Sequence, residues 1–185
     1  LNLARGGRST LSYRDEGLWD RVIARLKAGE PGAVHHVLIQ FGHNDQPGKP
    51  GRSTDLATEF PANLARYVAD VRAAGGSPVL LTPLTRRSFK GATLNADLAP
   101  WAEAVRAVAQ AHQVPLIDLH ASSAAAVQAL GAEQADLLAQ GPVGSPVFDR
   151  THLGPRGACL FAEQVLAGLM PLLSNVQPGG PAPDC

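Results

Sequence analysis

Residues 34–45 of the chain read VHHVLIQFGHND, a nonpolar run that passes directly into Gly, His, Asn and Asp. A continuous nonpolar run of about four to eight residues is typical of a buried β-strand, so residues 34–41 are predicted to form one. Polar side chains placed directly after a buried strand are costly unless they bond to something. The stretch therefore predicts a strand of a covered sheet, with chemically useful groups at its carboxyl end.

Short nonpolar runs and longer helical patterns alternate on both sides of this stretch. Further strands are predicted at residues 78–83 and 114–119. Helices are predicted at 16–28, from about 61 to 74, 98–108, 121–130, 133–140 and from 155 onward. This alternation predicts an α/β fold in which a doubly wound parallel sheet carries helices on both faces, in three layers. Chemistry in such folds gathers at the carboxyl ends of the strands.

Length and composition narrow the class of protein. The chain has 185 residues, of which 45% are hydrophobic, and this suits one domain over residues 1–176 with a disordered tail at 177–185. Its 16 basic and 16 acidic residues balance without a charged block, so neither a nucleic-acid partner nor a membrane partner is expected. Cys159 and Cys185 are too few for a disulfide framework, and whether they pair stays open.

The first polar cluster is residues 2–10, NLARGGRST. The adjacent Gly6 and Gly7 allow the backbone to approach a ligand closely or to adopt a positive φ. The alternative is an ordinary strand-to-helix turn, which this cluster on its own favours.

The second cluster is residues 42–45, GHND, after the strand quoted above. The side-chain amide of Asn44 can donate a hydrogen bond to a developing oxyanion. Equally, Asn44 and Asp45 can cap the next turn.

The third cluster is residues 149–152, DRTH, just before the helix that starts near Pro155. An Asp three residues before a His can accept from one ring nitrogen and leave the other free to act as a base. The alternative is that Asp149 caps a loop and His152 is an ordinary surface residue. A zinc site built from His43, Asp45, Asp149 and His152 is conceivable, but no zinc-site spacing supports it, so we expect neither a metal nor a cofactor.

Taken together and in this order, the clusters resemble those of the SGNH (GDSL-like) hydrolases. The closest likeness is to their rhamnogalacturonan acetylesterase branch, which removes acetyl groups from pectin. Residues 2–9 match its NxAxxGRS block, residues 42–45 its GHND block, and residues 149–157 its DxTHxxxxG block. Segments 82–89 and 115–120 are also similar to this branch, so the resemblance extends from Asn2 to the last predicted helix.

The resemblance implies an esterase that acts on an acetylated carbohydrate, with His152 as general base and Asp149 as the residue that orients it. It implies that the Gly7 backbone N–H and the Asn44 side-chain amide form the oxyanion hole. We also expect His43, Arg86 and Arg87 to contact the sugar, as inferred from their positions.

One block of this family is absent: the chain contains no Gly-Asp-Ser, where the nucleophilic serine would lie. Neither Ser9 nor Ser12 occupies the nucleophile position. We therefore expect the first strand and its serine to be missing, so that the chain is an N-terminally incomplete and inactive piece of an esterase. The alternative is a non-catalytic carbohydrate-binding or scaffold protein that has lost this strand. The exact acyl group, the sugar, the oligomeric state and the location (secreted, periplasmic or cytoplasmic) stay open.

Overall fold

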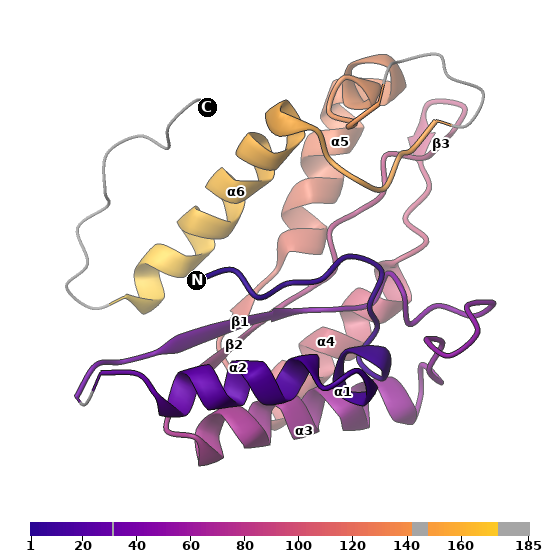
Figure 1. Cartoon of the computed structure of the whole chain (residues 1–185). Helices are drawn as coiled ribbons and strands as arrows, with labels where there is room; N and C mark the ends of the chain where they lie inside the picture. Colours follow the sequence, from indigo (N-terminus) through magenta and orange to yellow (C-terminus); the bar gives the residue numbers. More distant parts are fainter. Residues whose placement is uncertain (31, 142–147, 174–185) are drawn as a thin grey trace. The chain divides into compact units, whose positions relative to one another are not determined.

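The computed structural model describes residues 1–30, 32–141 and 148–173 (Figure 1). These residues form two compact units. Unit 1 comprises Leu1–Pro83 and Pro100–Leu116, and unit 2 comprises Leu84–Ala99 and the described residues from Ile117 onward. The predicted tail at 177–185 lies outside the described residues. One domain over residues 1–176 stays a prediction.

Unit 1 is built around two parallel strands. Its elements are α1 (Ser12–Asp15), α2 (Leu18–Lys27), β1 (His36–Gln40), α3 (Glu59–Ala73), β2 (Ser77–Leu81) and, from Pro100 on, α4 (Ala99–Ala111). Strand β1 pairs in parallel with β2, with His36 opposite Ser77 and Gln40 opposite Leu81. Strand β5 (Leu116–Ile117), where the chain passes between the units, completes the order β1-β2-β5. The predicted α/β fold with a parallel sheet is therefore confirmed.

The core of unit 1 lies between α3 and the sheet. Helix α3 repeats nonpolar residues at helical spacing, and these are the residues it buries: Phe60, Leu64, Tyr67, Val68 and Val71. On β2, Val79 and Leu80 are fully buried. Burial of each such side chain stabilises the fold by about 1.5–3 kcal/mol. Helix α3 begins at Glu59, so Pro61 lies in its first turn, where a missing N–H costs no helical hydrogen bond.

Unit 2 has its own hydrophobic cluster. Its further elements are β3 (Phe89–Lys90), β4 (Thr93–Leu94), α5 (Leu119–Asp136), α6 (Pro155–Leu169) and the 3₁₀ turn η1 (Met170–Leu172). Val127, Leu138 and Phe161 are buried together, and Leu84 and Phe89 pack against them. Helix α6 begins at Pro155, as predicted, because proline suits the first helical turn.

The element boundaries differ from the predicted ones in three places. The two helices predicted at 121–130 and 133–140 are both present within α5 and separate at Gly131, whose φ of 72° is not helical, but the second helix ends at Asp136. The strand predicted at 114–119 is reduced to Leu116–Ile117. The β3–β4 hairpin and α1 were not predicted, because two-residue strands and a single helical turn leave no period to detect. None of the described helices is long and apolar enough to cross a membrane.

Candidate functional site

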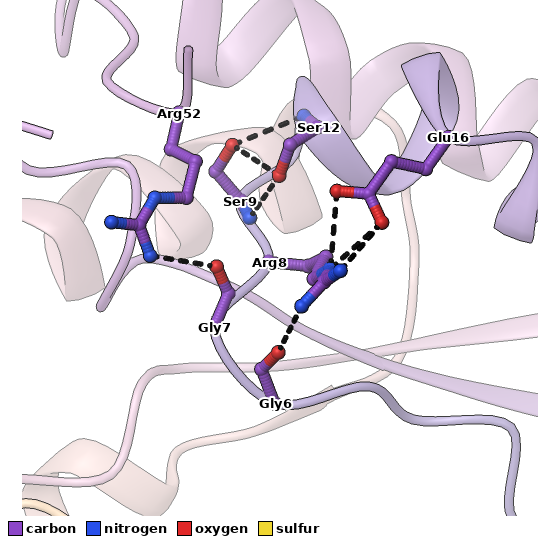
Figure 2. A network of polar contacts seen from close by, with 7 residues as sticks. All are labelled: Gly6, Gly7, Arg8, Ser9, Ser12, Glu16 and Arg52. Atoms are coloured by element: carbon purple, nitrogen blue, oxygen red, sulfur yellow. Dashed lines mark hydrogen bonds and ion pairs between the residues drawn. The ribbon is translucent and has the colours of Figure 1, made fainter. Parts of the chain in front are cut away.

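The glycine turn of unit 1 is held by two arginines (Figure 2). Gly7 has a φ of 77°, a conformation that glycine adopts without strain. Its carbonyl accepts from Arg52 Nη1 at 3.1 Å, while Arg8 donates to the Gly6 carbonyl at 3.0 Å and pairs with Glu16. No acceptor among the described residues binds the Gly7 N–H, so this donor is available to a ligand.

Ser9 and Ser12, which follow this turn, bond to each other (Figure 2). The Ser9 N–H donates to Ser12 Oγ at 3.0 Å, and the Ser12 N–H donates to Ser9 Oγ at 3.2 Å. Both side chains are buried. This reciprocal exchange closes the turn that leads into α1. The two hydroxyls therefore serve the local fold, in line with the expectation that neither is a nucleophile.

Asp45 joins the glycine turn to the end of β1. Its carboxylate is completely buried and accepts from the Thr10 N–H at 2.9 Å and the Thr10 hydroxyl at 2.5 Å. It also accepts from the Gly42 N–H at 3.1 Å and the Thr54 hydroxyl at 3.2 Å. Burial raises the pKa of Asp45, although these hydrogen bonds oppose the shift. With both oxygens occupied, Asp45 has a structural role and is a poor metal ligand.

Asn44 lies beside the glycine turn as a result. Its Nδ2 donates to the Arg8 carbonyl at 3.3 Å, and no other acceptor in the described part of the chain uses this amide. Because an amide carries two N–H donors, one remains for a ligand. The two predicted oxyanion donors, Gly7 and Asn44, therefore lie in loops that contact each other.

Gly42 and His43 shape the exit from β1. Gly42 has a φ of 127°, and a Cβ there would lie 3.2 Å from Pro83 Cγ, so a larger residue would be both strained and crowded. The His43 carbonyl accepts from the Lys49 ammonium. Contact between His43 and a sugar stays a prediction.

The Asp149–His152 pair forms in unit 2 as predicted from its spacing. His152 Nδ1 lies 2.6 Å from Asp149 Oδ2. The other carboxylate oxygen accepts from the backbone N–H groups of Thr151, at 2.7 Å, and His152, at 2.9 Å. The His152 side chain is 67% exposed. A hydrogen bond on Nδ1 leaves Nε2 as the nitrogen that can accept a proton.

The charge state of Asp149 follows from the same contacts. Partial burial raises the pKa of Asp149, but the N–H groups of His152 and Thr151 and the His152 ring outweigh it and lower the pKa to about 2. An unfolded Asp titrates near about 3.9. Because the folded value is the lower one, these bonds stabilise the loop fully above about pH 4 and are lost as the pH falls toward 2.

The Arg87 side chain binds backbone carbonyls of the loop that carries Asp149 and His152. Its side chain is completely buried, and Nη2 donates to the carbonyls of Asp149, at 3.1 Å, and His152, at 2.7 Å. The backbone N–H of Arg87 donates to the Arg150 carbonyl at 3.0 Å. The prediction that Arg87 contacts a sugar is therefore wrong. Its side chain is buried and binds the loop, so it is not accessible to a substrate from solvent.

Arg86 and Arg150 make further contacts that fix the same loop. Arg86 Nε donates to Thr151 Oγ1 at 3.1 Å, and its Nη1 pairs with Asp97. Arg150 makes a bidentate ion pair with Asp136, in which Nε and Nη2 each donate to one carboxylate oxygen at 2.9 Å. Contact between Arg86 and a sugar stays a prediction.

Replacing Arg87 by methionine is expected to destabilise unit 2. The change removes the donor to the carbonyls of Asp149 and His152, and a hydrogen bond to a charged group contributes about 1.5–3 kcal/mol. We expect Arg87→Met to lower the free energy of unfolding by about 2–4 kcal/mol, measured by urea denaturation. Arg106→Met is the matched control, because Arg106 is a partly exposed arginine of α4 that pairs with Glu103. Equal stability of the two variants would contradict the role given to Arg87.

Several of these contacts could not be found by sequence reasoning. Thr10, Thr54 and Asp45 form one buried cluster although Thr10 and Asp45 are 35 residues apart, and Arg87 reaches a loop 62 residues away. No motif marks such pairs. Among the described residues there is also no group of three or more His, Cys, Asp or Glu side chains that could hold a metal ion.

Comparison with known sequences identifies related proteins. The GDSL-like Lipase/Acylhydrolase family matches residues 1–159. Rhamnogalacturonan acetylesterase RhgT of Bacillus subtilis is 32% identical over 176 residues, which cover 91% of this chain and 72% of that protein. Probable rhamnogalacturonan acetylesterase YesY of the same organism is 31% identical over 173 residues, which cover 93% of this chain and 76% of that protein.

Solved structures share the fold. Protein YxiM of Bacillus subtilis superposes with a TM-score of 0.76 at 24% identity over 92% of this chain, which spans only 45% of that protein's chain. A mutant of an acetyl-xylooligosaccharide esterase from Geobacillus has a TM-score of 0.65 at 18% identity, covering 94% of this chain and 72% of that one. At these identities, the likeness concerns the fold alone.

Proposed function

The chain belongs to the GDSL-like lipase/acylhydrolase family, and we propose that it forms most of a carbohydrate acetylesterase that removes acetyl groups from a pectin-type polysaccharide or oligosaccharide. The family match confirms the resemblance found in the three sequence blocks. The proposal for the substrate is supported by the relatives RhgT, a rhamnogalacturonan acetylesterase, and YesY, a probable one, which are 32% and 31% identical to this chain. No observation favours a non-catalytic binding protein.

The observation that carries the proposal is the Asp149–His152 pair. His152 takes the proton from a serine hydroxyl while the serine oxygen attacks the acetyl carbon, and it then gives that proton to the departing sugar oxygen. Water, activated by the same ring, hydrolyses the acetyl-serine to acetate and free serine. Asp149 holds the ring through Nδ1, at 2.6 Å, so that Nε2 performs both transfers.

The proposed oxyanion hole consists of the Gly7 N–H and the free N–H of the Asn44 amide. Both donors are held in place before any substrate binds, Gly7 through Arg52 and Asn44 through the Arg8 carbonyl. Donors arranged in advance stabilise the negative charge that develops on the acetyl oxygen without the cost of reorganisation.

The serine itself is assigned to a Gly-Asp-Ser block outside these 185 residues. The printed sequence has no such block, and Ser9 and Ser12 are buried and bonded to each other. The 185-residue chain alone is therefore expected to hydrolyse no acetate ester, whereas the protein that also carries this block, called the serine-bearing protein below, is expected to be active.

The proposal is tested by acetate release from acetylated rhamnogalacturonan, with acetylated xylan as the comparison substrate. We expect the serine-bearing protein to release acetate from the first substrate faster than from the second, and its Ser→Ala form to release none. Faster release from xylan would overturn the substrate assignment. Retained turnover in the Ser→Ala form, or loss of turnover with a chelator, would overturn the mechanism.

A further inference from the structure

The first proposed oxyanion donor belongs to the least restrained kind of peptide group. The N–H of Gly7 and the carbonyl of Gly6 are parts of one peptide group, which joins two glycines. Because glycine lacks a Cβ, rotation on both sides of this group meets little steric resistance. In the described part of the chain, a Cβ added at Gly6 would have no non-neighbouring atom within 4 Å. The direction of the Gly7 N–H therefore depends on hydrogen bonds to this peptide group.

The Arg8 side chain provides such a hydrogen bond (Figure 2). Its Nη1 donates to the Gly6 carbonyl at 3.0 Å. Because a peptide group is planar and trans, its carbonyl and its N–H point in opposite directions. The contact that fixes the Gly6 carbonyl therefore also fixes the Gly7 N–H, on the side away from the guanidinium. A donor on the carbonyl also polarises the peptide group, which strengthens its N–H as a donor.

Glu16 holds the guanidinium of Arg8 in place. Arg8 Nε donates to both carboxylate oxygens of Glu16, at 3.1 and 2.9 Å, and Nη2 lies 2.8 Å from Oε2. Two nitrogens on one carboxylate fix the plane of the guanidinium, which a single contact would leave free to rotate. Glu16 directly follows α1, and its backbone N–H donates to the Ser12 carbonyl at 3.1 Å. The helix, Glu16 and Arg8 thus form one continuous support for the peptide between Gly6 and Gly7.

Arg8 also contacts the second proposed donor. Its backbone carbonyl accepts from Asn44 Nδ2 at 3.3 Å. Arg52, by contrast, donates to the Gly7 carbonyl at 3.1 Å, and this carbonyl belongs to the following peptide group. The side chain of Arg8 therefore orients the Gly7 N–H, while its main chain places the Asn44 amide. The relative position of the two donors thus depends on this one residue.

We propose that Arg8, held by Glu16, is a positioning residue of the oxyanion hole, whose guanidinium keeps the Gly7 N–H directed at the acetyl oxygen. This inference rests on the proposed function, because it assigns a support to the donors named there. Arg8 acts through the peptide between Gly6 and Gly7 and not by contact with the substrate. Without the guanidinium, this peptide can rotate and turn the N–H away, so the oxyanion loses one of its two donors for part of the time.

Arg8→Met is expected to lower kcat for 4-nitrophenyl acetate by about 10–100-fold in the serine-bearing protein. The donor is misdirected and not removed, so the loss is smaller than the loss of about 100–1,000-fold expected when a donor is removed outright. KM should change little, because full negative charge develops on the acetyl oxygen only in the transition state. The free energy of unfolding, measured by urea denaturation, should also change little, because the Arg8 and Glu16 side chains are 31% and 43% exposed. A purely structural role would produce the opposite pattern.

Three further variants separate positioning from folding. Arg8→Lys keeps a donor for the Gly6 carbonyl but lacks the planar fork that binds Glu16, so it should recover part of the lost kcat, and it serves if the methionine variant fails to fold. Glu16→Gln removes the charge that holds Arg8 and should lower kcat by less than Arg8→Met does. Arg14→Met is the matched control, because Arg14 lies on α1 and pairs with Asp70 of the same unit at 2.7 Å. We expect Arg14→Met to keep the wild-type kcat.

The ¹⁵N NMR relaxation of the Gly7 amide tests the inference without using turnover. We expect an order parameter near about 0.85 in the wild-type serine-bearing protein and below about 0.6 in its Arg8→Met form. An equal order parameter in both proteins, or a kcat of Arg8→Met equal to that of Arg14→Met, would overturn the positioning role and leave the proposed function standing. A wild-type protein that hydrolyses no ester would instead contradict the proposed function, and a lower order parameter in Arg8→Met would still support Arg8 as the residue that fixes Gly7.

Discussion

His152→Ala is expected to lower kcat/KM for 4-nitrophenyl acetate by at least about 10⁴-fold in the serine-bearing protein. Without the imidazole, no group accepts the serine proton, so neither formation nor breakdown of the acetyl-serine is assisted. The loss is expected mainly in kcat, because proton transfer occurs in the transition state and contributes little to substrate binding. Steady-state kinetics measures both constants.

The matched control for this change is His112→Ala. His112 is an exposed histidine that follows α4; its backbone N–H donates to the Val108 carbonyl at 3.0 Å and its carbonyl accepts from Arg72 at 2.9 Å. We expect His112→Ala to keep wild-type kinetics. A His152→Ala enzyme within about tenfold of wild type would exclude this residue as the general base. Asp149→Asn is also expected to impair the reaction. The Asn side chain does not hold the His152 ring in the tautomer with a proton on Nδ1, which leaves Nε2 free to accept the serine proton.

Asn44→Ala is expected to lower kcat by about 100–1,000-fold, equivalent to roughly 3–4 kcal/mol. The amide loses its donor to the acetyl oxygen, on which full negative charge develops only in the transition state. KM should therefore change much less than kcat. The measurement is steady-state hydrolysis of 4-nitrophenyl acetate by the serine-bearing protein.

Asn63→Ala separates this effect from a general loosening of unit 1. Asn63 Nδ2 donates to Thr10 Oγ1 at 3.1 Å, so its removal also costs a hydrogen bond near the Asp45 network. We expect Asn63→Ala to lower the free energy of unfolding by about 1 kcal/mol and to leave kcat nearly unchanged. If both variants lowered kcat alike, Asn44 would be structural and its assignment to the oxyanion hole would be wrong.

Most of the architecture could be predicted from local patterns. The nonpolar run at residues 34–41 contains β1, although the predicted burial of this strand holds only for Ile39, and the helical spacing from Phe60 to Val71 corresponds to α3. These elements are detectable because a residue's place in a strand or helix decides which face it presents, and that face must be nonpolar. Elements of two to four residues, such as α1 and β3, are too short to carry a period.

In the candidate site, too, contacts between residues near each other in the chain could be predicted, and contacts between distant residues could not. The Asp149–His152 pair could be predicted because its members are three residues apart, and one turn of loop brings them into contact. The local sequence suggests for Asp45 a cap of a neighbouring turn or a place in a zinc site, whereas its carboxylate binds Thr10 across the fold. Arg87 was expected to meet a sugar, and the structure buries it beneath the loop that carries His152.

The sequence by itself thus determined the class of fold, the family blocks and the pairing of Asp149 with His152, because each depends on residues that are near one another in the chain. Only the tertiary structure decided that Asp45 is a buried clamp, that Arg87 is a support for the loop, and that β1 has an open edge. Those outcomes depend on which distant segments pack together, and the burial and hydrogen bonding that result are properties of the packed segments and not of any short stretch.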